Sequence, residues 1–284
     1  MHRVSRIVYR VSSYTPVILY KMLPILADFG FMKIYTFGVF LTLAFFWGAF
    51  FLWKNISLTS HKEDEVFDGV FSAIIGAVLI GRIEYVALHF SDFGYSISKF
   101  VLINGYPGIG VIGFIAGFWL SLVLFTSSRK IAFRSFVDHA VPPFILAIAI
   151  IKLGAFFAGT QVGTQTAFFL SLSYSHLDGM RHLTPLYESI LFFVGSFFSY
   201  KILRSIRRNN LFEGFNLIFF VWLFSFITVV FDPITSFRTL IKGISFDLVL
   251  GSLFLLTTTV YLIYHFRDLI IVQSMRVFAF RKKK

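Results

Sequence analysis

The sequence predicts an all-α polytopic membrane protein with about seven transmembrane helices. Two properties of the composition support this prediction, because hydrophobic residues make up 57% of the 284 residues and charged residues only 14%. A soluble domain of ordinary composition carries roughly 25% charged residues. The third observation is a series of apolar windows, each close to the ~20 residues that cross a bilayer as a helix. The chain has no cysteine, which excludes disulfides, thiolate metal sites and a thiol nucleophile of its own.

The apolar windows define the expected elements in chain order. Prolines and charges interrupt the apolar pattern of residues 1–33, so we expect an interfacial arm in the headgroup region. The transmembrane domain is expected over 34–266, with spans near 34–53, 68–90, 107–127, 137–158, 185–203, 214–232 and 245–266. Residues 267–284 are expected to form a basic cytoplasmic tail. In the fourth span, Pro142 and Pro143 should kink the helix or delay its start, because proline lacks a backbone donor.

The distribution of Lys and Arg predicts the orientation. These residues concentrate in the loops after the first, third and fifth spans and in the C-terminal tail. Because basic loops remain on the cytoplasmic side, the C-terminus is expected in the cytoplasm and the N-terminus outside. The net charge of +12 is then a topology signal. We expect no nucleic-acid binding, since no soluble basic domain is present to support it.

Two cations lie inside predicted spans. Arg82 falls within the second span and Lys152 within the fourth. A cation in hydrocarbon costs at least ~2.5–3.5 kcal/mol, so it usually faces a polar cavity, a buried partner or an anionic ligand. With the orientation above, both residues lie in the outer half of the bilayer, near Arg181 and His182 at the start of the fifth span. The sequence therefore predicts an outward-facing site for a negatively charged group.

Each of these residues also has a structural interpretation. Arg82 would form an ion pair with Asp138 or Glu188 on another helix. Lys152 would extend along the helix to the interface. His182 would cap the fifth span or bond a neighbouring carbonyl. The sequence leaves these alternatives open.

Six short motifs occur in an order typical of one family of bacterial membrane enzymes. They are IYTFGVF (34–40), GRIEY (81–85), GIGVIG (108–113), FVDHAVPP (136–143), KLGAFFAGTQVG (152–163) and RHLTPLYE (181–188). Together they resemble the prolipoprotein diacylglyceryl transferase family, and RHLTPLYE is the most specific. The resemblance implies a monomeric enzyme of the bacterial inner (plasma) membrane that needs no cofactor or metal. Its expected reaction moves diacylglycerol from phosphatidylglycerol to the lipobox cysteine of an exported prolipoprotein.

The resemblance also implies roles for individual residues. The expected catalytic residues are a bidentate phosphate clamp, a second cation and a base, namely Arg82, Lys152 and His182. The residues expected to bind phosphatidylglycerol are Arg82, Tyr85, Lys152, Arg181, Tyr187 and Glu188. The glycines expected to serve structure through close helix packing are Gly110, Gly113, Gly154 and Gly159.

The chain departs from the family pattern at positions that carry chemistry. Gly108, or Pro107 in the other register, stands where the family has its catalytic histidine. Lys152 replaces the signature arginine, and Ser225 lies near the position of the family's arginine in the sixth span. Two alternatives therefore stand beside the enzyme. One is an inactive relative that binds an anionic phospholipid or a lipoprotein precursor, and the other is a small transporter with charges at mid-membrane.

Overall fold

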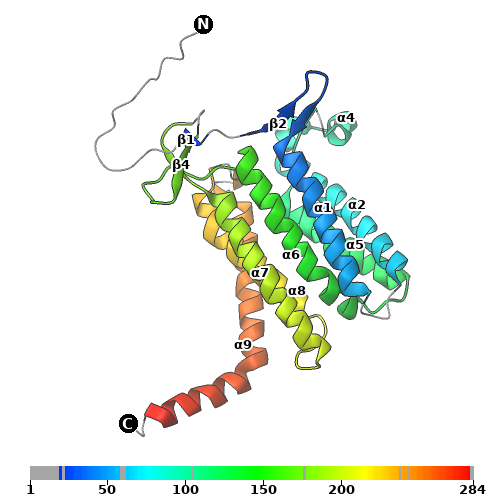
Figure 1. Ribbon diagram of the computed structural model, residues 1–284, viewed down its shortest axis with the longest axis vertical. Coiled ribbons are helices and arrows are strands. Elements are labelled where there is room, and N and C mark those ends of the chain that lie inside the picture. Colours follow the sequence, from blue (N-terminus) through cyan, green and yellow to red (C-terminus); the bar gives the residue numbers. More distant parts are fainter. Residues whose placement is uncertain are drawn as a thin grey trace.

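In the computed structural model, seven long helices pack into a bundle (Figure 1). The structure describes residues 19–20, 23–57, 62–103, 105–174, 177–236, 238, 240–241 and 243–281. Within these residues, the helices that are long and apolar enough to cross a membrane are α1 (Thr36–Ile56), α2 (Glu63–Leu88), α5 (Val111–Ser128), α6 (Phe133–Ala158), α7 (Thr184–Arg207), α8 (Phe215–Phe231) and α9 (Phe246–Arg281). The prediction of an all-α membrane protein with seven spans is confirmed.

Shorter elements connect the spans. They are the helices α3 (Phe90–Phe93) and α4 (Ile97–Val101), the 3-10 turn η1 (Asp232–Ile234), and the strands β1 (Leu19–Tyr20), β2 (Ile25–Asp28), β3 (Lys33–Tyr35), β4 (Ser171–Tyr174), β5 (Met180–His182), β6 (Leu240–Ile241) and β7 (Ile244–Ser245). Strands β1, β4 and β5 form one sheet, in which β1 is parallel to β4, while β2–β3 and β6–β7 are antiparallel pairs. Elements β2, β4 and α4 lie at the same end of the bundle (Figure 1).

The two predicted flanking segments are described only in part. Residues 1–18 and 21–22 of the predicted arm lie outside the described residues. Strand β2 lies within the arm, and its partner β3 begins at the arm's last residue, Lys33. The interfacial position of the arm stays a prediction. At the other end, α9 continues as far as Arg281, through most of the predicted tail. Its cytoplasmic location also stays a prediction.

Helix α6 is the centre of the bundle. It packs against α1 and α7, while α2 packs against α5 and α8 against α9. Half of the apolar window of α6 is buried, against 6% for α9. Its side chains Val137, Val141, Ile145 and Ala149 are fully buried and belong to the main hydrophobic cluster. The position of α6 therefore determines where the surrounding helices place their polar residues.

The proline pair lies inside α6 and does not delay its start. Because Pro142 and Pro143 provide no N–H, the carbonyls one turn earlier, at Asp138 and His139, lose their helical donors. A carbonyl without a partner costs several kcal/mol in a membrane interior. These two positions therefore need donors from other helices.

Two asparagines provide the missing donors. On α8, the Asn216 side-chain amide donates to the Asp138 carbonyl at 3.1 Å. On α1, the Asn55 amide donates to the His139 carbonyl, also at 3.1 Å. The Asp138 carboxylate in turn accepts the backbone N–H of Gly214 at 2.6 Å and that of Asn216 at 3.1 Å, which satisfies the first N–H groups of α8. The hydrogen bonds that compensate for the prolines thus join α6 to both α1 and α8.

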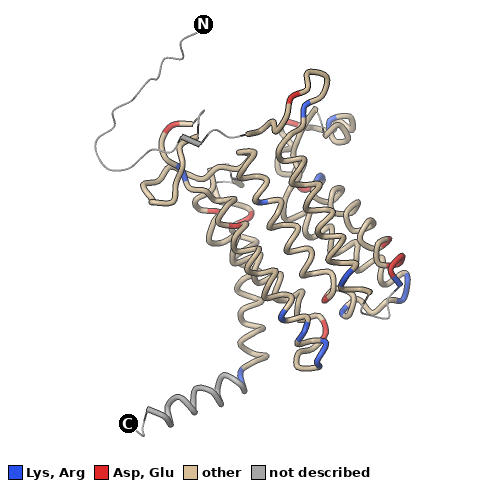
Figure 2. The backbone as a smooth tube through the Cα atoms, in the orientation of Figure 1, with Lys and Arg blue, Asp and Glu red and all other residues tan. Residues whose placement is uncertain are grey.

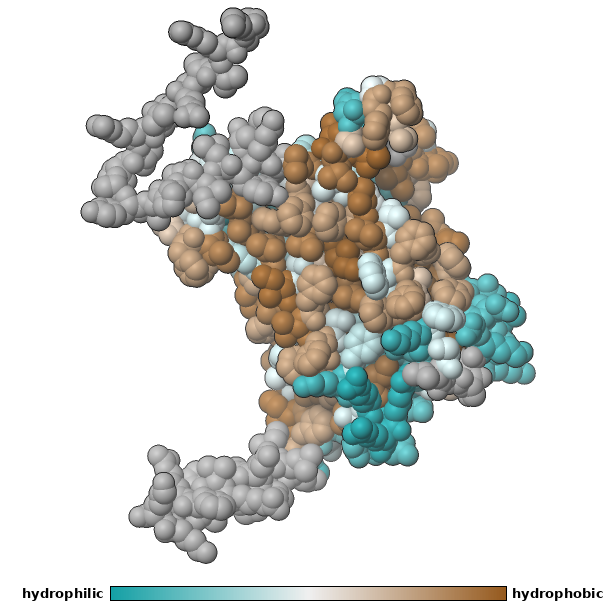
Figure 3. Space-filling view, viewed as in Figure 1, coloured by the Kyte–Doolittle hydropathy of each residue, from teal (hydrophilic) through white to brown (hydrophobic). Residues whose placement is uncertain are grey.

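Basic residues concentrate at one end of the bundle. Lys and Arg residues gather at the end away from β2 and β4, around the last turn of α7 and the turn between α5 and α6 (Figure 2). The same end carries the most hydrophilic surface in the space-filling view, and hydrophobic side chains cover the face between the two ends (Figure 3). This distribution is typical of a protein that spans a bilayer with its basic end in the cytoplasm.

We predict that Asn216→Ala lowers the free energy of unfolding by about 1–3 kcal/mol, because the Asp138 carbonyl becomes a buried acceptor without a donor. Thermal unfolding of the purified protein in detergent would measure this loss. The matched control is Asn210→Ala, since Asn210 is an exposed turn residue. Equal melting temperatures for the two variants would contradict this account of α6.

Candidate functional site

An ion pair joins two of the residues that the sequence singled out. Lys152, in the last turns of α6, forms an ion pair with Glu188 near the start of α7, and both side chains are largely buried, with 18% and 12% exposed. The Lys152 ammonium also donates to the Gln161 side-chain oxygen at 3.1 Å. Lys152 therefore points to partners inside the protein and not along the helix to the interface.

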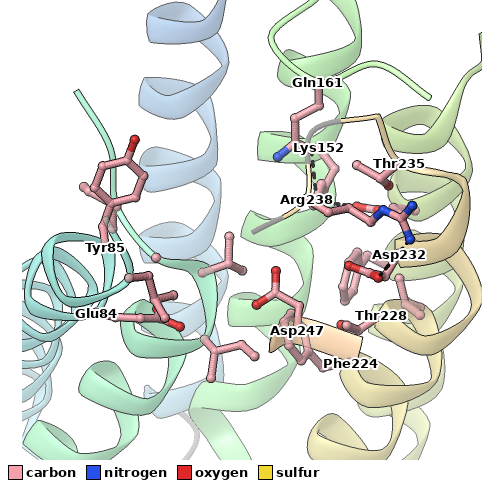
Figure 4. Close-up of a pocket in the computed structure, with 18 residues that line it drawn as sticks. Glu84, Tyr85, Lys152, Gln161, Phe224, Thr228, Asp232, Thr235, Arg238 and Asp247 are labelled. Carbon is pink, nitrogen blue, oxygen red and sulfur yellow. Dashed lines mark hydrogen bonds and ion pairs between the residues drawn. The ribbon is translucent and has the colours of Figure 1, made fainter. Parts of the chain in front are cut away.

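The ion pair borders a cavity of about 210 Å³. The cavity is bounded on one side by α2 and the start of α5, and on the other by residues of α6, α7, α8, η1 and α9 (Figure 4). Its charged and polar lining residues are Glu84, Tyr85, Lys152, Gln161, Glu188, Thr228, Asp232, Thr235, Arg238 and Asp247. Phe192, Phe224 and Ile227 contribute apolar surface. Small-molecule sites are enclosed clefts in which polar groups converge beside apolar surface, and this cavity has both, with an unusually large share of charged groups.

A second charge pair lies near the start of α9. Arg238 faces Asp232 with an N–O distance of 3.9 Å, and the Asp232 side chain is 8% exposed. Ser245 donates its hydroxyl to the other oxygen of Asp232 at 2.9 Å. Among the described lining residues, four carboxylates thus share the cavity with two cations, Lys152 and Arg238.

Arg82 fixes a loop and does not line this cavity. Its guanidinium donates to the carbonyls of Phe100 at 2.9 Å, Lys99 at 2.7 Å and Gly108 at 2.7 Å, and lies 5.0 Å from the centre of the Phe93 ring. The side chain is buried, with 2% exposed. Within the described residues, no ion pair joins Arg82 to Asp138 or Glu188. The structural alternative for Arg82, an ion pair with Asp138 or Glu188, is therefore wrong within the described residues, since backbone carbonyls take its place. The phosphate-clamp role stays a prediction.

The residues next to Arg82 complete this side of the cavity. The Glu84 carboxylate accepts the Gly113 N–H at 2.5 Å, which fixes the first turn of α5 against α2. Gly110 donates its N–H to the Gly81 carbonyl at 2.8 Å. A Cβ at Gly110 or Gly113 would collide with the Glu84 side chain. Tyr85 lines the cavity and stacks on His89 with 4.2 Å between the ring centres.

The other two motif glycines serve α6. A Cβ at Gly154 would collide with Phe40 on α1, so glycine permits the close approach of the two helices. Gly159 ends α6 with φ +67°, a left-handed conformation that favours glycine. Gly154 thus lies at a close helix contact, whereas Gly159 serves to end α6.

Arg181 and His182 lie outside the set of lining residues. Arg181 donates to the Gly163 carbonyl at 3.3 Å and to the Ser236 hydroxyl at 3.1 Å, which holds β5 against the segments after α6 and α8. The His182 ring lies 6.0 Å from Phe168 and 6.4 Å from Tyr187, and its Nδ1 is buried without a hydrogen bond within the described residues. The Tyr187 hydroxyl donates to the Leu170 carbonyl. The structure thus brings together Tyr85, Lys152 and Glu188 but not Arg82, Arg181 or His182.

Sequence reasoning missed four charged residues of the cavity, Glu84, Asp232, Arg238 and Asp247. Asp247 lies within the last predicted span, so the test that singled out Arg82 and Lys152 applies to it equally. Asp232 and Arg238 lie at the boundary after the sixth span, where charges are ordinary. No local sequence pattern indicates that the fold places these two side chains at the cavity.

The comparison with known families agrees with the motifs. Residues 24–264 match the family described as prolipoprotein diacylglyceryl transferase. The chain belongs to this family. The matched region includes the first six spans, most of the seventh and the residues that line the cavity. The resemblance inferred from six short motifs is therefore confirmed.

Individual relatives carry the name phosphatidylglycerol–prolipoprotein diacylglyceryl transferase. One from Clostridioides difficile is 28% identical over 190 residues, which are 66% of this chain and 73% of the relative. One from Clostridium tetani is 25% identical over 194 residues, 66% of this chain and 77% of the relative. One from Enterococcus faecalis reaches 36% identity over a shorter stretch of 106 residues, 37% of each chain.

We predict that Arg82→Lys loosens the segment 97–110, because a single ammonium cannot span the three carbonyls that the guanidinium fork reaches. Amide hydrogen exchange in this segment should accelerate, and the free energy of unfolding should fall by about 1–3 kcal/mol. Arg129→Lys is the matched control, since Arg129 is exposed at the end of α5. Unchanged exchange over 97–110 would contradict the loop-fixing role.

We predict that Glu188→Gln destabilises the protein by about 3 kcal/mol, because the Lys152 ammonium is left in a largely buried position without its carboxylate. Thermal unfolding in detergent would measure the loss. The double variant Lys152→Met, Glu188→Gln should recover much of it, since the uncompensated charge is gone. If the double variant is no more stable than the single one, the ion pair contributes nothing to the fold.

Proposed function

We propose that the chain is a phosphatidylglycerol–prolipoprotein diacylglyceryl transferase. The observation that supports this most is the family match over residues 24–264 together with a polar cavity inside the membrane-spanning bundle. The named relatives transfer a diacylglyceryl group from phosphatidylglycerol to a prolipoprotein. The cavity of about 210 Å³ suits a phosphoglycerol headgroup, and the two acyl chains would extend between helices into the bilayer.

The reaction makes a thioether and releases glycerol phosphate. The prolipoprotein cysteine loses its proton, and the thiolate attacks the glyceryl carbon that carries the phosphate ester. The carbon–oxygen bond breaks, and the phosphate oxygen leaves with the bonding electrons. Negative charge therefore grows on the phosphate as the bond breaks. Cations already placed around it in a dry cavity lower this barrier.

Lys152 and Arg238 are the cations available for this role. Both line the cavity, and each already faces a carboxylate, Glu188 and Asp232 respectively. The Arg238 pair is the looser, at 3.9 Å, so its guanidinium can turn to the phosphate without losing a short hydrogen bond. Arg82 has an indirect, positioning role: it donates to the Gly108 carbonyl and so fixes the segment that leads to Gly110 at the cavity wall.

The same proposal covers location and assembly. We place the protein in the bacterial plasma membrane, with the N-terminus outside and the C-terminus in the cytoplasm. The basic end of the bundle in Figure 2 supports this orientation. We also propose that the enzyme acts as a monomer. An inactive lipid-binding relative is the second candidate, favoured by the glycine at position 108 and by the excess of carboxylates in the cavity.

We predict that the purified protein in lipid nanodiscs transfers labelled diacylglycerol from phosphatidylglycerol to a lipobox peptide. Lys152→Gln should reduce the rate about 100-fold or more, because a preorganised donor to the leaving oxygen is lost. Lys201→Gln, at an exposed position on α7, should leave the rate unchanged.

Three further results decide between the candidates. A lipobox peptide with serine in place of cysteine should receive no label. Binding of phosphatidylglycerol without any transfer by the unaltered protein would favour the inactive relative. A rate for Lys152→Gln equal to that of the unaltered protein would remove Lys152 from the mechanism.

A further inference from the structure

The proposed transfer needs a group that accepts the proton of the attacking thiol. A thiol is a poor nucleophile at neutral pH, and a base within hydrogen-bond reach increases its reactivity. His182 was the candidate from sequence, but it does not line the cavity. The base therefore has to be found among the groups that do. The argument here rests on the proposed transferase function.

Three of the four cavity carboxylates are already engaged. Glu188 forms the ion pair with Lys152, and Asp232 accepts the Ser245 hydroxyl and faces Arg238. Glu84 accepts the Gly113 N–H at 2.5 Å. A proton placed on any of these carboxylates would weaken an interaction that holds two elements together. Each is therefore a poor proton acceptor during turnover.

Asp247 is the remaining carboxylate. It lines the cavity, and its carboxylate points into the space between Glu84 and Asp232 (Figure 4). Within the described residues, no hydrogen bond or ion pair is made by the Asp247 side chain. Among the described carboxylates of the cavity, Asp247 is therefore the one that can receive a proton from an entering group without losing such an interaction.

The chain holds Asp247 firmly in this position. It is the second residue of α9, directly after the β6–β7 pair. Ser245, which is 4% exposed, accepts the Leu248 N–H at 3.3 Å and donates to Asp232, so it caps the helix and ties its start to η1. The helix cap and the β6–β7 pair thus fix the Asp247 side chain at the cavity wall.

We propose that Asp247 is the general base of the transfer. The thiol proton moves to an Asp247 carboxylate oxygen while the sulfur attacks the glyceryl carbon and the carbon–oxygen bond to the phosphate breaks. The phosphate oxygen leaves with the bonding electrons, facing Lys152 and Arg238. The proton then passes from Asp247 to the departing phosphate or to water, and the carboxylate returns to its ionised form. The other ionisable groups that face this step are Glu84, Tyr85, Glu188 and Asp232.

The test compares Asp247→Asn with the unaltered protein in the lipobox-peptide assay. We expect kcat to fall about 100-fold or more at pH 7, the usual size of a general-base contribution, while KM for phosphatidylglycerol changes little. The rate should then rise with pH toward the thiol's own ionisation, near ~8.5, because hydroxide replaces the missing base. Asp247→Glu should retain a large part of the activity. A purely structural role would not give this pH profile.

Two comparison variants separate base catalysis from charge. Glu84→Gln removes a carboxylate from the same cavity, and its rate should follow pH in parallel with the unaltered protein. Asp68→Asn, at an exposed position of α2, should leave kcat unchanged. If Asp247→Asn does not accumulate, Asp247→Ala with added formate is the alternative, since a small carboxylate entering the cavity should restore part of the rate.

The outcomes are distinct for the two proposals. An active unaltered protein together with an equally active Asp247→Asn overturns the assignment of Asp247 and leaves the transferase function standing. The same is true if Asp247→Asn and Glu84→Gln lose activity alike with parallel pH profiles, or if formate restores nothing in Asp247→Ala. An unaltered protein that binds phosphatidylglycerol but transfers nothing overturns both proposals.

Discussion

Two backbone carbonyls in the interior of α6 have no helical donor, and the bundle depends on how they are satisfied. Pro142 and Pro143 remove the N–H groups, and Asn216 and Asn55 replace them from α8 and α1. Because an unpaired carbonyl is so costly in lipid, these bonds fix the rotation and depth of α6 relative to both neighbours. Lys152 lies further along the same helix, so its meeting with Glu188 follows from this arrangement.

The electrostatics of the cavity suit a reaction in which negative charge moves. Four carboxylates and two cations share a small volume, and two of those carboxylates already balance the cations. A phosphate entering the cavity would add to the negative charge. If Asp247 takes up the thiol proton, it becomes neutral while charge develops on the leaving phosphate. The total negative charge of the cavity therefore stays nearly constant during the reaction.

Neighbouring residues of the motif around Arg82 have different roles, since some hold the backbone and another faces the cavity. Arg82 binds the carbonyls of Lys99, Phe100 and Gly108, so it shapes the chain that enters α5. Glu84 fixes the first turn of that helix, and Tyr85 faces the cavity. A family motif can therefore retain its pattern because one wall of the site depends on it. Direct contact with substrate is not required of every motif residue.

The sequence by itself determined the class of the protein, the place of its seven spans and its family, and it singled out Lys152 and Glu188, which the structure places at the cavity. Hydropathy and short motifs are local properties, and they fix how deep a residue lies in the bilayer. They do not fix the direction in which it points around the bundle. For that reason Arg82, Arg181 and His182 were expected beside Lys152, whereas the structure places Asp232, Arg238 and Asp247 there. Only tertiary packing decided this, because the β6–β7 pair and the capped start of α9 return distant residues to the cavity.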